Sequence, residues 1–147
     1  MADIARNRQA SYKFNLLEKW EAGLQLQGSE VKSLRNGGVQ LKDAFATVSD
    51  GEVWLHNMHI APYAPASREN HDPERSRKLL LHKGEIERLI GRTSEKGLTL
   101  IPTRIYWKNG RAKIEIALAR GKNVQDKRRY LKEKDARREI QQALQDR

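Results

Sequence analysis

The side chains most able to bind a ligand in this sequence are its many cations. The 147 residues include 29 Lys and Arg but only 19 Asp and Glu, which gives a formal net charge of +10 and a sequence pI near 10.0. Each cation that displaces a counterion from a phosphate adds to nucleic-acid affinity, so this excess indicates a polyanionic partner. The sequence has no cysteine, which excludes disulfides, thiolate zinc sites and cysteine nucleophiles and fits a reducing cytoplasm.

Groups suited to catalysis are sparse by comparison. The four histidines form no metal-ligand motif and have no carboxylate at a recognisable catalytic spacing, so we expect no bound metal, no cofactor and no enzymatic activity; they are His56, His59, His71 and His82. No run of about 18 apolar residues is present and the N-terminus lacks an apolar signal core, which predicts no membrane segment and a cytoplasmic protein.

One short stretch, residues 28–35, combines a core-facing side with a basic side. Ser29 suits a helix N-cap, and Gly37 or Gly38 suits the left-handed residue that ends a helix. Apolar residues three apart would seat this helix on a core, while Lys32 and Arg35 would form its basic face. Spacing alone favours a solvated amphipathic helix without a role in binding.

The other elements follow from periodicity and turn residues. We expect a mobile arm over residues 1–8, because it has nothing to pack, and then short strands and helices. Asp50-Gly51 and Asn109-Gly110 each lie between strand-like runs and predict tight hairpins. The remaining expected elements are an interrupted strand at 10–26, strands at 43–48 and 52–58, helices at 72–81 and 85–90, and strands at 99–107 and 114–118.

Together these elements predict a mainly β fold with short helices. An OB-like closed antiparallel barrel over residues 1–120 would leave no exposed strand edges. Residues 121–147 differ: nine are basic, five are acidic and only four are aliphatic residues larger than alanine. Such a segment cannot fold alone, so we expect a separate basic tail that is disordered, or helical on a template. A solvated tail without a role is the alternative.

Five motifs in this order resemble the signatures of SmpB, a bacterial family that binds transfer-messenger RNA (tmRNA). They are Glu21-Ala22-Gly23-Leu24, the stretch 28–35, Arg77-Lys78-Leu79-Leu80-Leu81, Tyr106-Trp107-Lys108-Asn109-Gly110 and the stretch 121–128. The resemblance runs from about Asn7 to the C-terminus. It departs from the family pattern at Asn123 and Gln125, which leaves base stacking there in doubt.

The resemblance implies an OB-like barrel that binds the tRNA-like domain of tmRNA and delivers it to stalled ribosomes for trans-translation, that is, ribosome rescue and peptide tagging. It implies a monomer whose tail reaches the decoding centre and senses the empty mRNA channel. The RNA-facing residues would be Asn7, Arg8, Glu21, Lys32, Arg35, Leu80 and Lys113; the ribosome-binding residues of the tail would be Gly121, Lys122, Asp126, Lys127 and Arg128.

Several alternatives remain open on the residues alone. Consecutive leucines cannot all face RNA, so at least two of Leu79, Leu80 and Leu81 should be core. Glu21 repels phosphate and makes sense only as an acceptor for base or sugar donors, or as a partner that organises a nearby lysine. Phe14 could stack on RNA or pack in the core. A generic OB-fold RNA-binding protein or RNA chaperone is the rival function.

Overall fold

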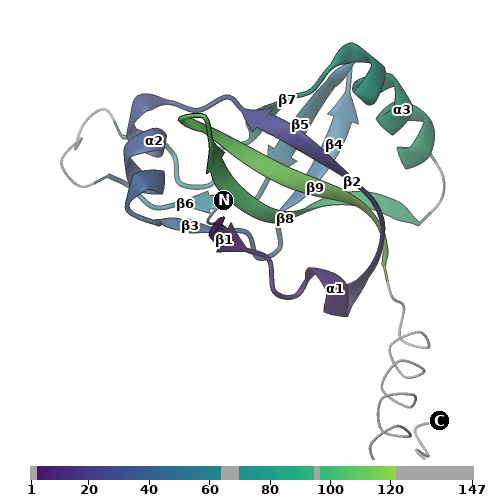
Figure 1. The fold of residues 1–147 in the computed structure, drawn as a ribbon, viewed down its shortest axis with the longest axis horizontal. Helices are drawn as coiled ribbons and strands as arrows, with labels where there is room; N and C mark the ends of the chain where they lie inside the picture. Colours follow the sequence, from purple (N-terminus) through teal and green to yellow (C-terminus); the bar gives the residue numbers. More distant parts are fainter. Residues whose placement is uncertain (1–2, 64–69, 95–96, 122–147) are drawn as a thin grey trace, which may run out of the picture.

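Antiparallel strands dominate the structure, a computed structural model in which residues 3–63, 70–94 and 97–121 are described (Figure 1). This confirms the mainly β prediction. The strands are β1 (Asp3–Arg6), β2 (Phe14–Leu24), β3 (Val39–Gln40), β4 (Phe45–Ser49), β5 (Glu52–His56), β6 (His59–Ile60), β7 (Arg77–Leu80), β8 (Leu98–Lys108) and β9 (Arg111–Gly121). The helices are α1 (Ala10–Lys13), α2 (Gly28–Arg35) and α3 (Lys83–Thr93).

Seven of the strands form one antiparallel sheet in the order β1-β8-β4-β5-β7-β2-β9. Strand β9 also pairs with β8 along its length, so the pairings from β8 round to β9 return to their start as a ring. Strand β1 pairs with residues 104–106 of β8, on the edge that β8 also presents to β4, and β3 pairs with β6 in a separate two-stranded sheet. The ring places β7, β2 and β9 side by side, so side chains from all three can meet on one outer face.

The two predicted hairpins are confirmed, because their turn residues adopt the backbone that the sequence suggested. Asp50 and Gly51 have φ of 52° and 75°, and Asn109 and Gly110 have φ of 52° and 76°. Aspartate, asparagine and glycine tolerate this left-handed region better than other residues, so each dipeptide closes its hairpin with little strain. The turns join β4 to β5 and β8 to β9.

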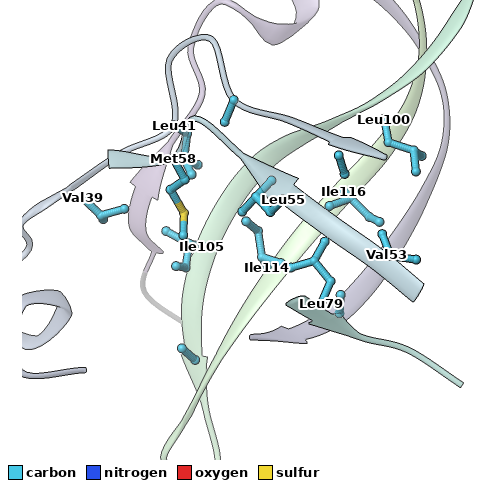
Figure 2. Packing of buried hydrophobic residues seen from close by; sticks show 14 of the residues in the cluster. Val39, Leu41, Val53, Leu55, Met58, Leu79, Leu100, Ile105, Ile114 and Ile116 are labelled. Atoms are coloured by element: carbon cyan, nitrogen blue, oxygen red, sulfur yellow. The ribbon is translucent and has the colours of Figure 1, made fainter. Parts of the chain in front are cut away.

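The core lies inside the ring and is built from alternate residues of its strands (Figure 2). In β5, Val53 and Leu55 are fully buried, while Trp54 between them and His56 after them are half-buried on the other face. Leu79 is 1% exposed and Leu81 packs on the same core, whereas Leu80 is 51% exposed. The expectation that at least two of the three leucines are core is therefore confirmed.

Three local predictions were wrong. The helix expected at 72–81 is absent; instead residues 77–80 form β7, paired with β5 and β2. Residues 10–13 form the short helix α1 rather than strand, and residues 3–6 of the expected mobile arm pair with β8 as β1. In each case partners far away in the sequence, which local pattern cannot reveal, decided the conformation.

The two short helices are confirmed with small differences. Helix α2 spans residues 28–35, but its N-cap is Gln27 rather than Ser29, and Gly37 supplies the positive φ, 74°, just after the helix. Helix α3 covers the predicted 85–90 helix and extends it at both ends. The buried face of α2 includes Glu30 as well as Leu34, so this helix carries a charged side chain into the interior.

Candidate nucleic-acid interface

A groove of about 600 Å³ is lined by residues of β7, β2 and β9, of the turn between β8 and β9, and of α2. It brings together three of the seven predicted RNA-facing residues, Glu21, Leu80 and Lys113, which come from three different strands. Its other lining residues are Gly23, Leu24, Leu26, Val31, Leu81, His82, Glu85, Trp107, Gly110, Arg111 and Ala112. The groove therefore combines an apolar wall with both signs of charge.

Strand register explains how the groove is assembled. Gly23 in β2 is paired with Leu80 of β7 on one side and with Lys113 of β9 on the other. Residues directly opposite each other in antiparallel strands project to the same face. Leu80 and Lys113 therefore flank the glycine on the outer face, and Glu21, two residues before Gly23, lies on the same side of β2.

Glu21 is held by two donors from β8. The Tyr106 hydroxyl donates a hydrogen bond to Oε2 at 2.5 Å, and Lys108 Nζ lies 3.2 Å from Oε1 and 3.4 Å from Oε2. The Tyr106 hydrogen bond, followed by Lys108, lowers the pKa of Glu21. Burial, together with the Glu21 carboxylate, raises the pKa of Tyr106 to about 12. Glu21 is thus a fixed, ionised acceptor. It also positions Lys108, which agrees with the interpretation of Glu21 as a partner that organises a nearby lysine.

The other four predicted residues lie outside this groove. Asn7 and Arg8 line a smaller pocket of about 280 Å³ that shares no lining residue with it. The Asn7 amide donates to the Pro102 carbonyl at 3.0 Å, so this side chain fastens the start of the chain to β8. Lys32 and Arg35 lie on α2, the helix that contributes Val31 to the groove wall.

Sequence reasoning missed several residues of the groove. Trp107 and Arg111 flank the Asn109-Gly110 turn, and the hairpin brings both to the groove. The turn signal could have placed them together, because residues on either side of a two-residue turn pair with each other or nearly so. Tyr106 and Lys108 belong to one of the five family motifs, but nothing in the sequence paired them with Glu21, which lies more than 80 residues earlier.

A second ionic cluster lies beneath α2 and was also missed. Glu30 is fully buried and accepts hydrogen bonds from Arg77 Nε at 2.5 Å, Arg75 Nη2 at 2.6 Å and the Gln27 backbone N–H at 2.8 Å. Burial alone would raise the pKa of Glu30, but these donors outweigh it and hold the pKa below its usual value. Arg77, itself fully buried, also donates to the carbonyls of Met58 and Pro73.

A histidine extends this cluster. His71 Nε2 donates to the Ile60 carbonyl at 2.9 Å, and His71 Nδ1 forms a hydrogen bond of 2.8 Å with the Ser29 hydroxyl. Ser29 therefore binds a histidine instead of capping its helix. Together Ser29 and Glu30 tie α2 to the segment that leads into β7, and so set where α2 stands beside the groove.

One further sequence question, the role of Phe14, is answered within the described residues. Phe14 packs against Ala10, Ile101 and Ala119, which favours its core role over stacking on RNA. No group of three or more His, Asp or Glu in the described ranges is placed to hold a metal ion. No helix in those ranges is long and apolar enough to cross a membrane.

Only the root of the predicted tail falls within the described residues. Gly121 ends β9 and is paired with Phe14 of β2, so it belongs to the sheet rather than to a separate segment. Lys122, Asp126, Lys127 and Arg128 lie outside the described residues.

Comparison with known proteins covers nearly the whole chain. The sequence model of the SmpB protein family matches residues 4–146. The SsrA-binding protein of Sulfurihydrogenibium sp. (strain YO3AOP1) is 56% identical over 141 residues, covering 96% of this chain and 93% of its own. The SsrA-binding protein of Bacillus cytotoxicus is 58% identical over 144 residues, covering 98% of this chain and 93% of its own.

One solved structure is similar over the same extent. A chain of the structure described as "tmRNA-SmpB: a journey to the center of the bacterial ribosome" superposes with a TM-score of 0.70 at 46% sequence identity. The match covers 95% of this chain and 98% of the other.

Proposed function

Because this chain belongs to the SmpB family, we propose that it binds the tRNA-like domain of tmRNA and delivers it to stalled ribosomes for trans-translation. The observation that carries the proposal is identity at more than half of all aligned residues, over almost the full length, with proteins named for binding SsrA RNA. The solved relative described together with tmRNA and the bacterial ribosome supports both partners. The protein acts by binding, without catalysis, as a monomer in the cytoplasm.

The groove over β7, β2 and β9 is the principal RNA-binding surface in this proposal. Lys113 and Arg111 supply positive charge for phosphates, Leu80 and Trp107 supply apolar surface for bases, and Glu21 accepts from base or sugar donors. The ring serves as an OB-like barrel that holds these side chains in register. Lys32 and Arg35 extend the basic surface over α2, and Asn7 and Arg8 form a second, smaller contact.

The C-terminal segment that follows β9, residues 122–147, binds the ribosome. Its excess of positive charge suits a path lined by ribosomal RNA, and its low apolar content means that a template must order it. Within the vacant mRNA channel a basic helix with Asp126, Lys127 and Arg128 near its root would fit only when no message is present. This arrangement would sense a stalled ribosome sterically.

Parallel affinity measurements test the RNA-binding proposal. The full chain should bind the isolated tRNA-like domain of tmRNA at least about tenfold more tightly than an unstructured RNA of equal length, a difference of about 1.4 kcal/mol. Equal affinity for both RNAs would favour the generic RNA chaperone instead.

Truncation after Gly121 tests the tail, because it keeps all of β9. The truncated chain should bind the tRNA-like domain within about tenfold of the full chain, yet fail to support peptide tagging in a purified translation system. A matched variant with Asp126, Lys127 and Arg128 replaced together should behave in the same way. Normal tagging by the truncated chain would refute the sensing role.

A further inference from the structure

We propose that the groove is a subsite for one unstacked nucleobase that carries an exocyclic amino group, and that Gly23 is the positioning residue which sets its width. The inference rests on the proposed RNA-binding function and adds to it the part of the RNA that the groove reads. It is carried by the acceptor geometry of Glu21 and by the space around Gly23.

The carboxylate of Glu21 defines the hydrogen-bonding character of the subsite. An ionised carboxylate has about four acceptor positions and no donor. Tyr106 occupies one on Oε2, and Lys108, bridging the two oxygens, occupies one on each. Among the contacts of the described residues, one acceptor position therefore remains on Oε1, and the Glu21 side chain is 37% exposed.

An acceptor that is held ionised selects for donors. Its pKa is lowered by Tyr106 and Lys108, so at neutral pH it cannot offer a proton to a carbonyl. The exocyclic amines of cytosine, adenine and guanine can donate to it, as carboxylates accept from the cytosine amine in other complexes. Uracil, by contrast, presents a C4 carbonyl that would face a second acceptor, and its one ring donor, N3–H, lies between two carbonyl oxygens that the carboxylate repels. The site should therefore prefer a base with an exocyclic amine over uracil.

The walls of the groove suit the faces of a base. Leu80 is 51% exposed although its neighbour Leu79 is buried, so it offers apolar surface on the outer face of β7. Trp107 of β8, partly buried against the core, also lines the groove. Single-stranded bases gain about 1–3 kcal/mol by stacking on such side chains, largely independent of sequence. Stacking on these walls would supply the affinity for a base, and Glu21 would supply the preference for a base with an exocyclic amino group.

Gly23 controls how closely the two flanking side chains approach. A Cβ atom placed on Gly23 would lie 3.3 Å from Leu80 Cβ and 3.6 Å from Lys113 Nζ. The first distance is tighter than most Cβ contacts, whereas the second is ordinary van der Waals contact. Gly23→Ala should therefore displace Leu80 and fill the space between Leu80 and Lys113 without removing either side chain, and since Leu80 is exposed the strand can accommodate the shift.

The test uses a matched pair of ligands and a matched pair of variants. Cytidine and uridine monophosphate differ on the pyrimidine ring at C4 and N3 and share the same phosphate. In a titration followed by the backbone amide signals of residues 21–23, the wild-type chain should bind cytidine monophosphate more tightly, and Glu21→Gln should remove that preference. Equal response to the two nucleotides, or no response to either, would overturn the subsite.

The variants test the role of Gly23 in the RNA complex. Gly23→Ala should weaken binding of the tRNA-like domain by about fivefold to a hundredfold, the loss of one base contact. Gly91→Ala in α3, where an added Cβ meets nothing within 4 Å, should leave affinity unchanged. If the wild-type chain binds this RNA but Gly23→Ala binds equally well, the inference fails and the proposed function stands; if the wild-type chain does not bind it, the proposed function fails.

Discussion

Two glutamates, nine residues apart, do opposite work in this molecule. Glu21 stands on the outer face of β2, 37% exposed, with Tyr106 and Lys108 as partners and one side open to the groove. Glu30 lies on the inner face of α2, fully buried, and accepts hydrogen bonds from two of the protein's own arginines and from its backbone. Both carboxylates are kept ionised, but of the two only Glu21 can be reached by a ligand.

The difference separates recognition from architecture. A buried ion pair contributes little net stability when complete, because desolvation offsets the attraction, but removing one partner leaves an uncompensated charge. An exposed pair costs little to break. Changes around Glu30 should therefore act on folding and leave the affinity of folded protein nearly unaltered. Changes around Glu21 and Lys113 should lower the affinity for RNA and leave the free energy of unfolding nearly unaltered.

The largest expected effect is on folding. Arg77→Ala leaves Glu30 buried with one arginine fewer, and should lower the free energy of unfolding by about 3–5 kcal/mol. Arg88→Ala is the matched control, because Arg88 is 62% exposed in its pair with Glu18 and such pairs are worth at most about 1 kcal/mol. Urea denaturation of both variants measures the contrast. Similar losses in the two would remove the distinction between buried and exposed pairs.

The next effect is on binding. Lys113→Glu should weaken binding of the tRNA-like domain by about 1–3 kcal/mol and make it less dependent on salt, since a phosphate contact is lost. Its unfolding free energy should change little. Arg88→Glu makes the same change of charge outside the groove lining, so it separates a local contact from a general loss of positive charge. An unchanged salt slope for Lys113→Glu would count against the groove.

A smaller effect is expected from pH. The folded-state pKa of Glu30 is lowered from a usual value of 4.5, so its contribution to stability is complete above about pH 4.5 and is lost as pH falls through the folded value. The unfolding free energy should therefore decline below that pH. Glu30→Gln should flatten the decline only partly, because the pKa values of Asp3 and Glu21 are lowered as well. An identical pH profile in the variant would contradict the assignment.

How much of the fold could be predicted from the sequence depended on the distance between partners. The hairpins were predicted correctly because Asp50-Gly51 and Asn109-Gly110 carry their turn geometry locally. Strand β7 was mistaken for helix because its pairing with β5 and β2 is not encoded within residues 72–81. Local pattern is a weak guide wherever tertiary pairing decides.

The same rule holds for the site. The family resemblance, rather than any spacing, pointed to Glu21, Leu80 and Lys113, and the structure brings those three into one groove. The resemblance did not predict the arginine partners of Glu30, because they lie 45 and 47 residues later in a segment expected to be helical. Glu30 lies in the first turn of α2, where a negative charge is favourable whether the side chain is exposed or buried. Its burial depends on the position of β7, which brings Arg77 against it.

The most direct test of the division between recognition and architecture compares Glu21→Gln with Glu30→Gln, two identical changes measured in two ways. For each variant, affinity for the tRNA-like domain and the free energy of unfolding are determined under the same conditions. Glu21→Gln should lose at least about fivefold in affinity, as for one base contact, with little change in stability. Glu30→Gln should lose about 1–3 kcal/mol of stability with little change in affinity while folded. Parallel losses in both quantities for both variants would contradict the division.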